Sequence, residues 1–212
     1  MIDLYTWTTP NGRKVSILLE ELGVPYTAKA IDITKDEQFA PDFLKIAPNN
    51  RIPAIVDHDT GMHLMETGAI MMYLAKKYDR FQVEGDEYWR MVEWLMWQMG
   101  GMGPMLGQVH HFVKYNAGKS EYAEQRYSKE AHRLYTVLNT RLQDREFIVG
   151  AGTGAYTIAD MAIWPWVSRH DWQQIDLADF PNVRTWYNAI AQRPAVQRGY
   201  HVPKYVTDIP TA

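Results

Sequence analysis

The stretch NNRIPAIVDHDTGMHLMETGAI, residues 49–70, contains the features that decide the fold. Its apolar run at residues 52–56 predicts a strand that opens with a proline, and the turn signals at residues 57–61 predict a hairpin. Residues 62–65 are expected to form the returning strand. A helical pattern then runs from residue 66 to Tyr78. The order strand, strand, helix is typical of the second half of a small α/β domain.

The sequence before this stretch supplies the first half of the same domain. Strand and helix patterns alternate there, at residues 2–7, 15–22, 26–33 and 38–44. The cluster TTPNG at residues 8–12 predicts a turn before the first helix, and Gly23 predicts its stop. The segment 38–44 is either a short helix or irregular. Residues 1–80 therefore predict one α/β domain with the order βαβαββα.

From about residue 86 the strand signals disappear and long helical patterns dominate. Helices are expected at residues 88–99, 122–142, 157–170 and 182–192, the first of them interrupted by the glycines and proline of residues 100–104. Residues 81–86 are expected to link the two parts. The predicted fold class is α/β plus all-α, with an all-helical domain over residues 87–212.

The composition excludes several classes of protein. The 212 residues include 22 Lys and Arg against 25 Asp and Glu, whereas nucleic-acid-binding proteins usually show a basic excess. No apolar run approaches the roughly 20 residues of a membrane-spanning helix, and the first residues lack the pattern of a signal peptide. We therefore expect a cytoplasmic protein that binds neither nucleic acid nor membranes.

The sequence contains no cysteine. A disulfide, a thiolate metal site and a cysteine nucleophile are therefore all impossible. The adjacent His110 and His111 do not predict a metal site either, because they point to different faces of a helix and no third ligand is apparent. We expect them to line a cleft. If the protein carries out sulfur chemistry, the reacting sulfur must arrive with a ligand.

Two predicted helix starts carry polar residues that suit a charged ligand. Thr9 and Asn11 lie where the first helix begins, so that a hydroxyl and free backbone N–H groups would hold an anion such as a thiolate. Glu66 and Thr67 begin the helix after the hairpin, and together they would bind the ammonium and carboxylate of an amino-acid end. Helix capping is the structural alternative for each pair.

Two further features also allow two interpretations. A cis bond between Ile52 and Pro53 would present the Ile52 backbone to a ligand, whereas a trans proline would simply start a strand. Arg133 suits a carboxylate because its donors form a fork, but a surface ion pair is the simpler explanation of its spacing. The sequence TIAD at residues 157–160 fits a capping box that starts a core helix.

In order and spacing these segments resemble the glutathione transferase family over nearly the whole chain. More narrowly they resemble its bacterial Nu-class branch, the glutathione-dependent disulfide-bond oxidoreductases. The segments that carry the resemblance are TPNG at residues 9–12, APNNRIPAIVD at 47–57, ETGAI at 66–70, WQMGGMGPM at 97–105, GQVHHF at 107–112 and YTIAD at 156–160. The resemblance implies a thioredoxin-like first domain followed by the helical domain.

The resemblance also implies which residues bind glutathione. Thr9 and Asn11 would face its sulfur as the catalytic residues, and the Ile52 backbone, beside a cis Pro53, would pair with its cysteinyl group. The other implied glutathione-binding residues are Glu66 and Thr67 at the γ-glutamyl end, Gln38 and Arg51 along the glycyl side, and Arg133 at a second glutathione. Arg51 and Thr67 replace the lysine and serine that are common in the family. Arg51 keeps the positive charge but changes the geometry of its donors, and Thr67 keeps the hydroxyl.

The implied function is glutathione-dependent thiol–disulfide exchange by a homodimer that binds two glutathione molecules, or their disulfide, in each site. Conjugation of glutathione to small electrophiles is the close alternative. Tyr5 would then be another candidate activator, although its position inside the first strand favours core packing. A non-catalytic glutathione-binding or regulatory module is the alternative from a different class.

Overall fold

The computed structural model describes residues Met1–Ala212, which divide into two compact units. The first unit comprises Met1–Arg80 and Gln192–Ile209, and the second comprises Phe81–Ala191 and Pro210–Ala212. The chain thus divides close to the predicted linker, but residues 81–86 belong to the second unit. Residues 192–209 belong to the first unit, whereas the sequence pattern assigns them to the all-helical domain of residues 87–212.

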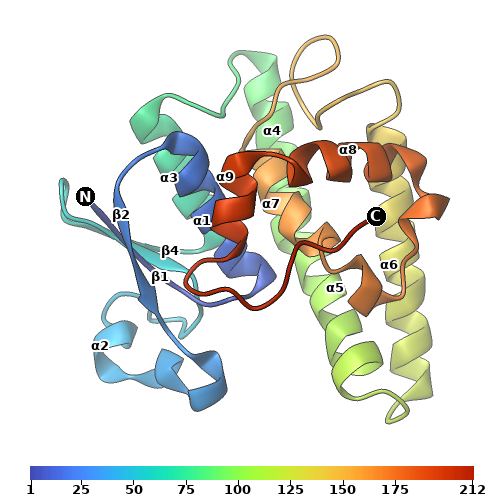
Figure 1. Ribbon diagram of the computed structural model, residues 1–212, viewed down its shortest axis with the longest axis horizontal. Coiled ribbons are helices and arrows are strands. Elements are labelled where there is room, and N and C mark those ends of the chain that lie inside the picture. The colour runs from blue at the N-terminus through green and yellow to red at the C-terminus, as the bar shows by residue number, and fades with distance from the viewer. The chain divides into compact units, whose positions relative to one another are not determined.

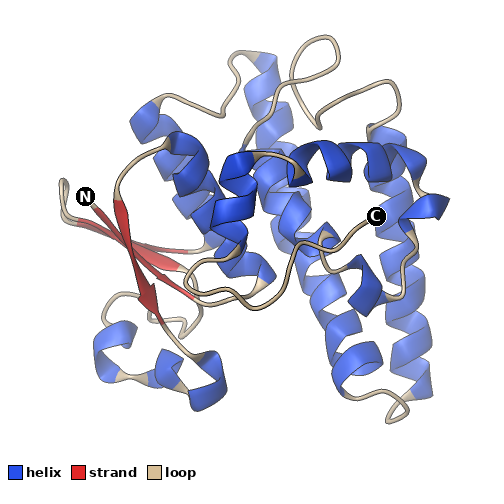
Figure 2. Cartoon of the chain, in the orientation of Figure 1, coloured by secondary structure: helices blue, strands red, loops and turns tan.

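The first unit is built on a four-stranded sheet (Figure 1, Figure 2). Its strands, in the spatial order β2-β1-β3-β4, are β1 (Ile2–Thr6), β2 (Tyr26–Ala30), β3 (Ala54–Asp57) and β4 (Met62–Met65). Strand β1 pairs in parallel with β2 and antiparallel with β3, and β3 pairs antiparallel with β4. The predicted order βαβαββα is confirmed.

Helices cover both faces of this sheet. Helices α1 (Pro10–Leu22) and α3 (Thr67–Tyr78) pack together and against the strands. The short α2 (Pro41–Leu44) lies on the other face, after two 3₁₀ turns at Ile33–Lys35 and Glu37–Phe39. Side chains alternate along a strand, so the Tyr5 ring turns to the α2 face, where it packs 6.1 Å from the Phe43 ring. Tyr5 is therefore partly buried against the small hydrophobic cluster that contains Phe43.

The local sequence fixes both ends of α1. Thr9 is the N-cap, since its Oγ1 accepts a hydrogen bond from the Gly12 N–H at 3.1 Å, and Pro10 stands in the first turn, where a missing N–H costs little. Gly23 ends the helix in the left-handed conformation, with φ at 68°. Gly12 has no room for a side chain, because a β-carbon would lie 2.2 Å from the Trp7 carbonyl oxygen. Helix α1 therefore begins tightly against the end of β1.

One helix of the first unit comes from the far end of the chain. Helix α9 (Pro194–Tyr200), which the sequence pattern does not reveal, packs against α1. The buried guanidinium of Arg13 donates from Nε to the Tyr200 carbonyl oxygen at 3.0 Å and lies 3.5 Å from the centre of the Tyr200 ring. The burial of this cation in α1 therefore depends on a residue almost two hundred positions away.

The second unit is helical, as predicted (Figure 2). Its helices are α4 (Asp86–Trp97), α5 (Gly103–Val109), α6 (Glu121–Arg141), α7 (Ile158–Val167) and α8 (Pro181–Ala191). The predicted interruption at residues 100–104 is not a break. A π-helical segment at Gln98–Met102 joins α4 to α5, and a second at His110–Tyr115 follows α5. The wider turns keep the helix continuous through its glycines. No helix combines the length and apolar character needed to cross a membrane.

Thr157 and Asp160 form the predicted capping box at the start of α7. The Ala159 N–H donates to Thr157 Oγ1 at 3.3 Å, and the Thr157 N–H donates to Asp160 Oδ2 at 3.0 Å. Asp160 Oδ1 also accepts from the Ile148 N–H at 3.0 Å and from Trp186 Nε1 at 2.9 Å. This fully buried carboxyl thus joins the start of α7 to the preceding loop and to α8.

Candidate active site

The register of the sheet brings the two predicted ligand-binding helix starts together. Tyr5, next to the end of β1, pairs with Ala54 at the start of β3, and Ala54 pairs with Met65 at the end of β4. The turn before α1, the loop before β3 and the start of α3 therefore meet at one end of the sheet. These three segments hold most of the residues that the sequence singles out.

Thr9 and Asn11 lie at the start of α1 and are both half-buried. Thr9 is a helix cap, yet capping uses only a lone pair of its hydroxyl oxygen, and the hydroxyl hydrogen stays available to a ligand. The N–H groups of the first turn also form the positive end of the helix dipole. Capping and anion binding are therefore compatible at Thr9.

The Ile52–Pro53 peptide bond is cis, as the family resemblance implies. Ile52 lies just outside β3, which begins at Ala54. Neither the N–H nor the carbonyl oxygen of Ile52 makes a backbone hydrogen bond within the chain. An extended ligand would therefore find an open backbone edge here, as in the addition of a strand to a sheet.

Glu66 and Thr67 lie where β4 passes into α3. Glu66 has φ at 70° and ψ at 116°, a conformation that residues other than glycine rarely adopt, and such strain is concentrated at functional sites. Its side chain does not cap α3, so the capping alternative does not hold here. Instead, Asn49 Nδ2 donates to Glu66 Oε1 at 3.4 Å. Asn49 belongs to the loop before Pro53, so this contact ties two of the three segments together.

Lys14 of α1 is a residue of this region that sequence reasoning misses. Its side chain is 1% exposed, and Nζ donates to Thr67 Oγ1 at 3.4 Å. Burial lowers the pKa of Lys14 to about 7, while the negative charge of Glu66 acts in the opposite direction. A lysine in an amphipathic helix ordinarily indicates an exposed face, and the packing of α1 on α3 reverses that expectation.

Gln38 and Arg51 belong to loops at the same end of the sheet. The turn that contains Gln38 follows β2, whose last residue pairs with Thr6. Gln38 is buried, its Nε2 donates to Asp36 Oδ1 at 3.4 Å, and its Oε1 has no hydrogen-bond partner. Arg51 is exposed, and its Nη1 donates to Asn50 Oδ1 at 3.0 Å. The pair offers a buried amide and an exposed cation.

Arg133 belongs to α6 of the second unit and forms the surface ion pair that its spacing suggests. Its Nε and Nη2 donate to the two carboxylate oxygens of Glu130 at 2.8 and 2.7 Å. It also lines a cavity of about 640 Å³ in which three cations face one carboxylate. The other lining residues are Met105, Tyr122, Gln125, Arg126, Tyr127, Lys129 and Glu130.

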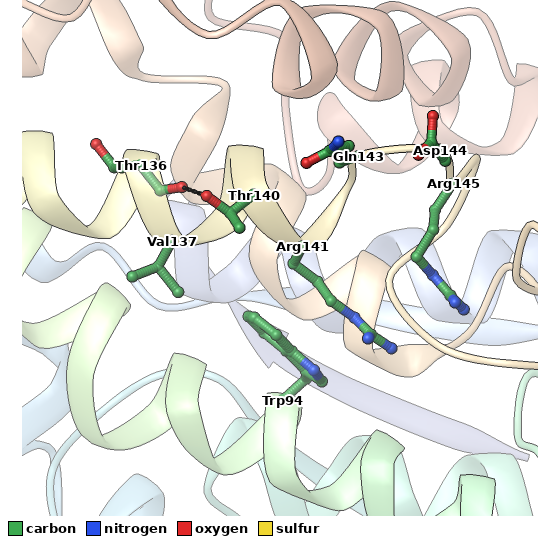
Figure 3. A pocket seen from close by; sticks show the side chains of 8 residues that line it. All are labelled: Trp94, Thr136, Val137, Thr140, Arg141, Gln143, Asp144 and Arg145. Carbon is green, nitrogen blue, oxygen red and sulfur yellow. Dashed lines mark hydrogen bonds between the residues drawn. The ribbon is translucent and has the colours of Figure 1, made fainter.

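A second cavity of this unit, of about 620 Å³, lies between α4 and the end of α6 (Figure 3). Arg141 extends beside Trp94 there, with its guanidinium 5.6 Å from the ring centre. Its Nε donates to the Ile148 carbonyl at 2.7 Å, and Arg145 Nη2 donates to the Gly150 carbonyl at 2.6 Å. Both arginines therefore hold the loop after α6 in place.

The paired histidines diverge, because His110 is buried while His111 is exposed. His110 is a core residue rather than part of a cleft lining, with its Nε2 3.2 Å from Gln173 Nε2 and its ring against Trp166. Burial and the charge of Arg169 lower the pKa of His110 to about 4. No cluster of three or more His, Asp or Glu side chains suited to a metal ion occurs in the structure.

Comparison with known proteins matches both units. The family model for the glutathione S-transferase N-terminal domain matches residues 1–76, and the family model for the C-terminal domain matches residues 101–194. The disulfide-bond oxidoreductase YfcG of Escherichia coli (strain K12) is 48% identical over 201 residues, which cover 92% of each chain.

Two solved structures are similar over nearly the full chain. A glutathione transferase from Burkholderia graminis, with two glutathione molecules bound per subunit, has a TM-score of 0.88 and 40% identity, covering 96% of this chain and 88% of that one. A glutathione transferase from Pseudomonas putida, with one glutathione disulfide bound per subunit, has a TM-score of 0.89 and 38% identity, covering 95% and 91%. Sequence, fold and these matches agree that the chain belongs to the glutathione S-transferase family.

Proposed function

We propose that the protein is a glutathione-dependent disulfide-bond oxidoreductase. The observation that carries this proposal is the meeting, at one end of the sheet, of the turn before α1, the loop before β3 and the start of α3, in a chain without a cysteine. A disulfide reductase of this composition must take both of its redox thiols from glutathione. The similarity to a named disulfide-bond oxidoreductase, and to a structure that holds glutathione disulfide, supports the same chemistry.

The proposed reaction consists of two exchange steps. A bound glutathione thiolate attacks one sulfur of a small disulfide, so that a mixed disulfide forms, the original S–S bond breaks and one thiolate leaves. A second glutathione thiolate attacks the glutathione sulfur of the mixed disulfide and releases the second thiolate. Two glutathione thiols are thereby oxidised to glutathione disulfide, and the two released thiolates take up the protons that the glutathione thiols lose.

We assign Thr9 and Asn11 as the catalytic residues, because both would donate hydrogen bonds to the glutathione sulfur. One hydrogen bond to a charged group contributes about 1.5–3 kcal/mol, which lowers the pKa of a thiol by about one to two units. A free thiol has a pKa of about 8.5, so such a shift makes the thiolate a major form near neutral pH. The dipole of α1 acts in the same direction.

The rest of the tripeptide would lie along the end of the sheet. The free backbone N–H and carbonyl of Ile52, beside cis Pro53, suit the cysteinyl residue. Thr67 at the start of α3 suits the α-carboxylate of the γ-glutamyl residue, and Glu66 suits its ammonium group. Gln38 and Arg51 are assigned to the glycyl side, where the buried Gln38 Oε1 lacks a partner and Arg51 offers a positive charge.

We assign Arg133 to a second glutathione molecule. The cationic cavity around Arg133 suits the carboxylates of glutathione, and the B. graminis relative holds two glutathione molecules per subunit. On binding glutathione, Arg133 would then either break its ion pair with Glu130 or share its guanidinium between Glu130 and the ligand. Replacing Arg133 with alanine should lower the number of bound glutathione molecules from two to one.

A homodimer is part of the same proposal. Trp89 and Met96 of α4 are 68% and 49% exposed, and residues seven positions apart share one face of a helix. Large apolar side chains exposed on one face are typical of a protein interface. We also propose a cytoplasmic location, where the reduced glutathione pool would supply the two thiols.

Parallel assays test the proposal. We expect glutathione-dependent reduction of hydroxyethyl disulfide to exceed conjugation of a chlorinated nitroaromatic, and native mass spectrometry to show one glutathione disulfide bound per subunit. Conjugation without disulfide reduction would identify an ordinary transferase instead. Binding of glutathione without turnover in either assay would identify a binding module.

A further inference from the structure

Lys14 is an unusual residue for the interior of a small domain. Its side chain is 1% exposed, although moving an ammonium group out of water is costly unless other groups compensate for it. The residues that follow it in α1, from Val15 to Leu19, are buried as well. Its charged end reaches the beginning of α3, where Nζ donates to Thr67 Oγ1 at 3.4 Å. The buried ammonium group of Lys14 thus contacts the Thr67 hydroxyl, which we assign to the γ-glutamyl carboxylate.

The direction of this hydrogen bond determines what the Thr67 hydroxyl offers to a ligand. A hydroxyl group has one hydrogen and two lone pairs. Because an ammonium group can only donate, Thr67 Oγ1 must accept from Lys14, and its own hydrogen points elsewhere. A neutral Lys14 amine would instead be able to accept that hydrogen and turn the hydroxyl inward. The charged form of Lys14 therefore prepares Thr67 to donate to a carboxylate.

The surroundings of Lys14 make its charge sensitive to an added anion. The elements packed against α1 are β1, α3 and α9, and Glu66 is the charged residue that acts on the pKa of Lys14. Burial lowers that pKa to about 7, so the ammonium and amine forms coexist near neutral pH. Lys76 of α3 is exposed, and other charged residues of these elements pair elsewhere: Asp3 with Lys29, Lys77 with Asp57 and Arg198 with Glu20.

We propose that Lys14 is a positioning residue for the α-carboxylate of glutathione, which it recognises through Thr67 by orienting the hydroxyl and supplying a buried positive charge. This inference rests on the proposed binding of glutathione at the end of the sheet. A carboxylate at Thr67 stabilises the charged form of Lys14, so binding takes up a proton when the solution pH lies above the pKa of the free protein. The affinity for glutathione thereby depends on pH through Lys14, which acts by way of Thr67.

The test compares two ligands on two proteins. Dissociation constants are measured by calorimetry for glutathione and for γ-aminobutyryl-cysteinyl-glycine, the same tripeptide without the α-carboxylate. The wild-type protein should prefer glutathione by about tenfold or more, the range expected of a hydrogen bond to a charged group. Lys14→Met should reduce this preference to about twofold and leave the affinity for the analogue nearly unchanged. The Lys14→Met variant should fold, because methionine replaces a buried charge with an apolar side chain of similar length.

Two controls separate a positioning role from a structural one. Lys76→Met removes an exposed positive charge from α3 and should keep the wild-type preference. In the wild type the preference should fall as pH rises from about 6 to about 9, whereas in Lys14→Met it should stay flat. If Lys14→Met keeps both the preference and its pH dependence, the proposed positioning role of Lys14 is wrong, but the proposed binding of glutathione is unaffected. If the wild type binds neither ligand, the proposed function itself fails, and the inference fails with it.

Discussion

Gly199 of α9 lies directly against the backbone of Ile17 in α1. A β-carbon on Gly199 would come within 2.7 Å of Ile17 Cα and 2.8 Å of Ile17 N. The two helices therefore touch backbone to backbone, at a point where neither can yield without moving the other. This contact joins the helix that carries Thr9 at its start to a segment from the far end of the chain.

Gly199→Ala should therefore destabilise the protein. Overpacking of a closely packed contact costs about 1–3 kcal/mol, and the clash here is with backbone atoms that cannot rotate away. Chemical denaturation followed by circular dichroism measures the change in the free energy of unfolding. Gly101→Ala is the matched control, because that helical glycine has open space around it and alanine should there be neutral or stabilising by up to about 1 kcal/mol. If Gly199→Ala is as stable as the wild type, the two helices do not pack as tightly at Gly199 as described.

Thr9→Ala should lose both activity and stability. The lost hydrogen bond to sulfur should slow disulfide exchange about 10- to 100-fold and raise the pKa of bound glutathione by about one to two units. The lost helix cap should cost about 1 kcal/mol of unfolding free energy. Ultraviolet titration of the bound thiolate and denaturant unfolding measure the two effects separately.

Thr9→Ser is the control, because it keeps the hydroxyl and should preserve both properties. Asn11→Ala should affect the thiol pKa in the same direction as Thr9→Ala. Full exchange activity in both alanine variants would remove these two residues from the proposed mechanism.

Glu66→Gly should separate stability from ligand binding. Glycine adopts positive φ without steric cost, so the variant relieves the strained backbone at φ 70° and should gain about 1 kcal/mol of stability. It also removes the carboxylate assigned to the ammonium group of glutathione, and affinity should fall about tenfold or more. Thermal unfolding and calorimetric titration of one protein preparation test both expectations.

Glu66→Ala serves as the comparison, since it removes the carboxylate but keeps the steric cost. It should lose the affinity without gaining the stability. A stable Glu66→Gly variant that binds glutathione as tightly as the wild type would contradict the assignment of Glu66.

Asp160 should make stability depend on pH in an unusual direction for a carboxyl group. Burial raises its pKa from 3.8 to about 6, against the effect of its hydrogen bonds. The folded state therefore keeps a proton that the unfolded chain releases, so the contribution of Asp160 is full below about pH 4 and is lost as pH rises through about 6. At about 1.4 kcal/mol per pKa unit, the loss between these values is about 3 kcal/mol.

The measurement compares the wild type with Asp160→Asn, which cannot titrate, at several pH values. Their difference in unfolding free energy should shrink, or change in favour of asparagine, as pH rises from about 4 to about 7. The comparison is necessary because His110 acts in the opposite direction: its lowered pKa removes stability as pH falls through about 6 towards 4. A difference that does not vary with pH would show that Asp160 stays ionised throughout.

Short-range sequence signals predict much of this fold. The cap at Thr9, the stop at Gly23 and the capping box of Thr157 and Asp160 depend on residues three or four positions apart, and all of them are found in the structure. The hairpin of β3 and β4 is likewise set by its own turn. These features need no knowledge of distant packing.

Features that depend on distant contacts escape the same reasoning. Helix α9 is only seven residues long, and its packing against α1 cannot be read from its own sequence. Lys14 has the spacing of an ordinary surface lysine until α3 covers it. The glycines of residues 100–104 predict an interruption by their low helix propensity, but the π-helical segment keeps the helix continuous. In each case packing overrides a local preference.

The sharing of one unit between the two ends of the sequence sets an order of events during synthesis. A chain emerging from the ribosome exposes residues 1–80 first, but Arg13 and the α9-facing side of α1 cannot make their contacts with α9 until residues 194–200 have been made. The helical unit between them is contiguous apart from its last three residues, so most of it is available earlier. Domains commonly fold in the order in which they emerge. Here the unit that contains the proposed glutathione site is completed last.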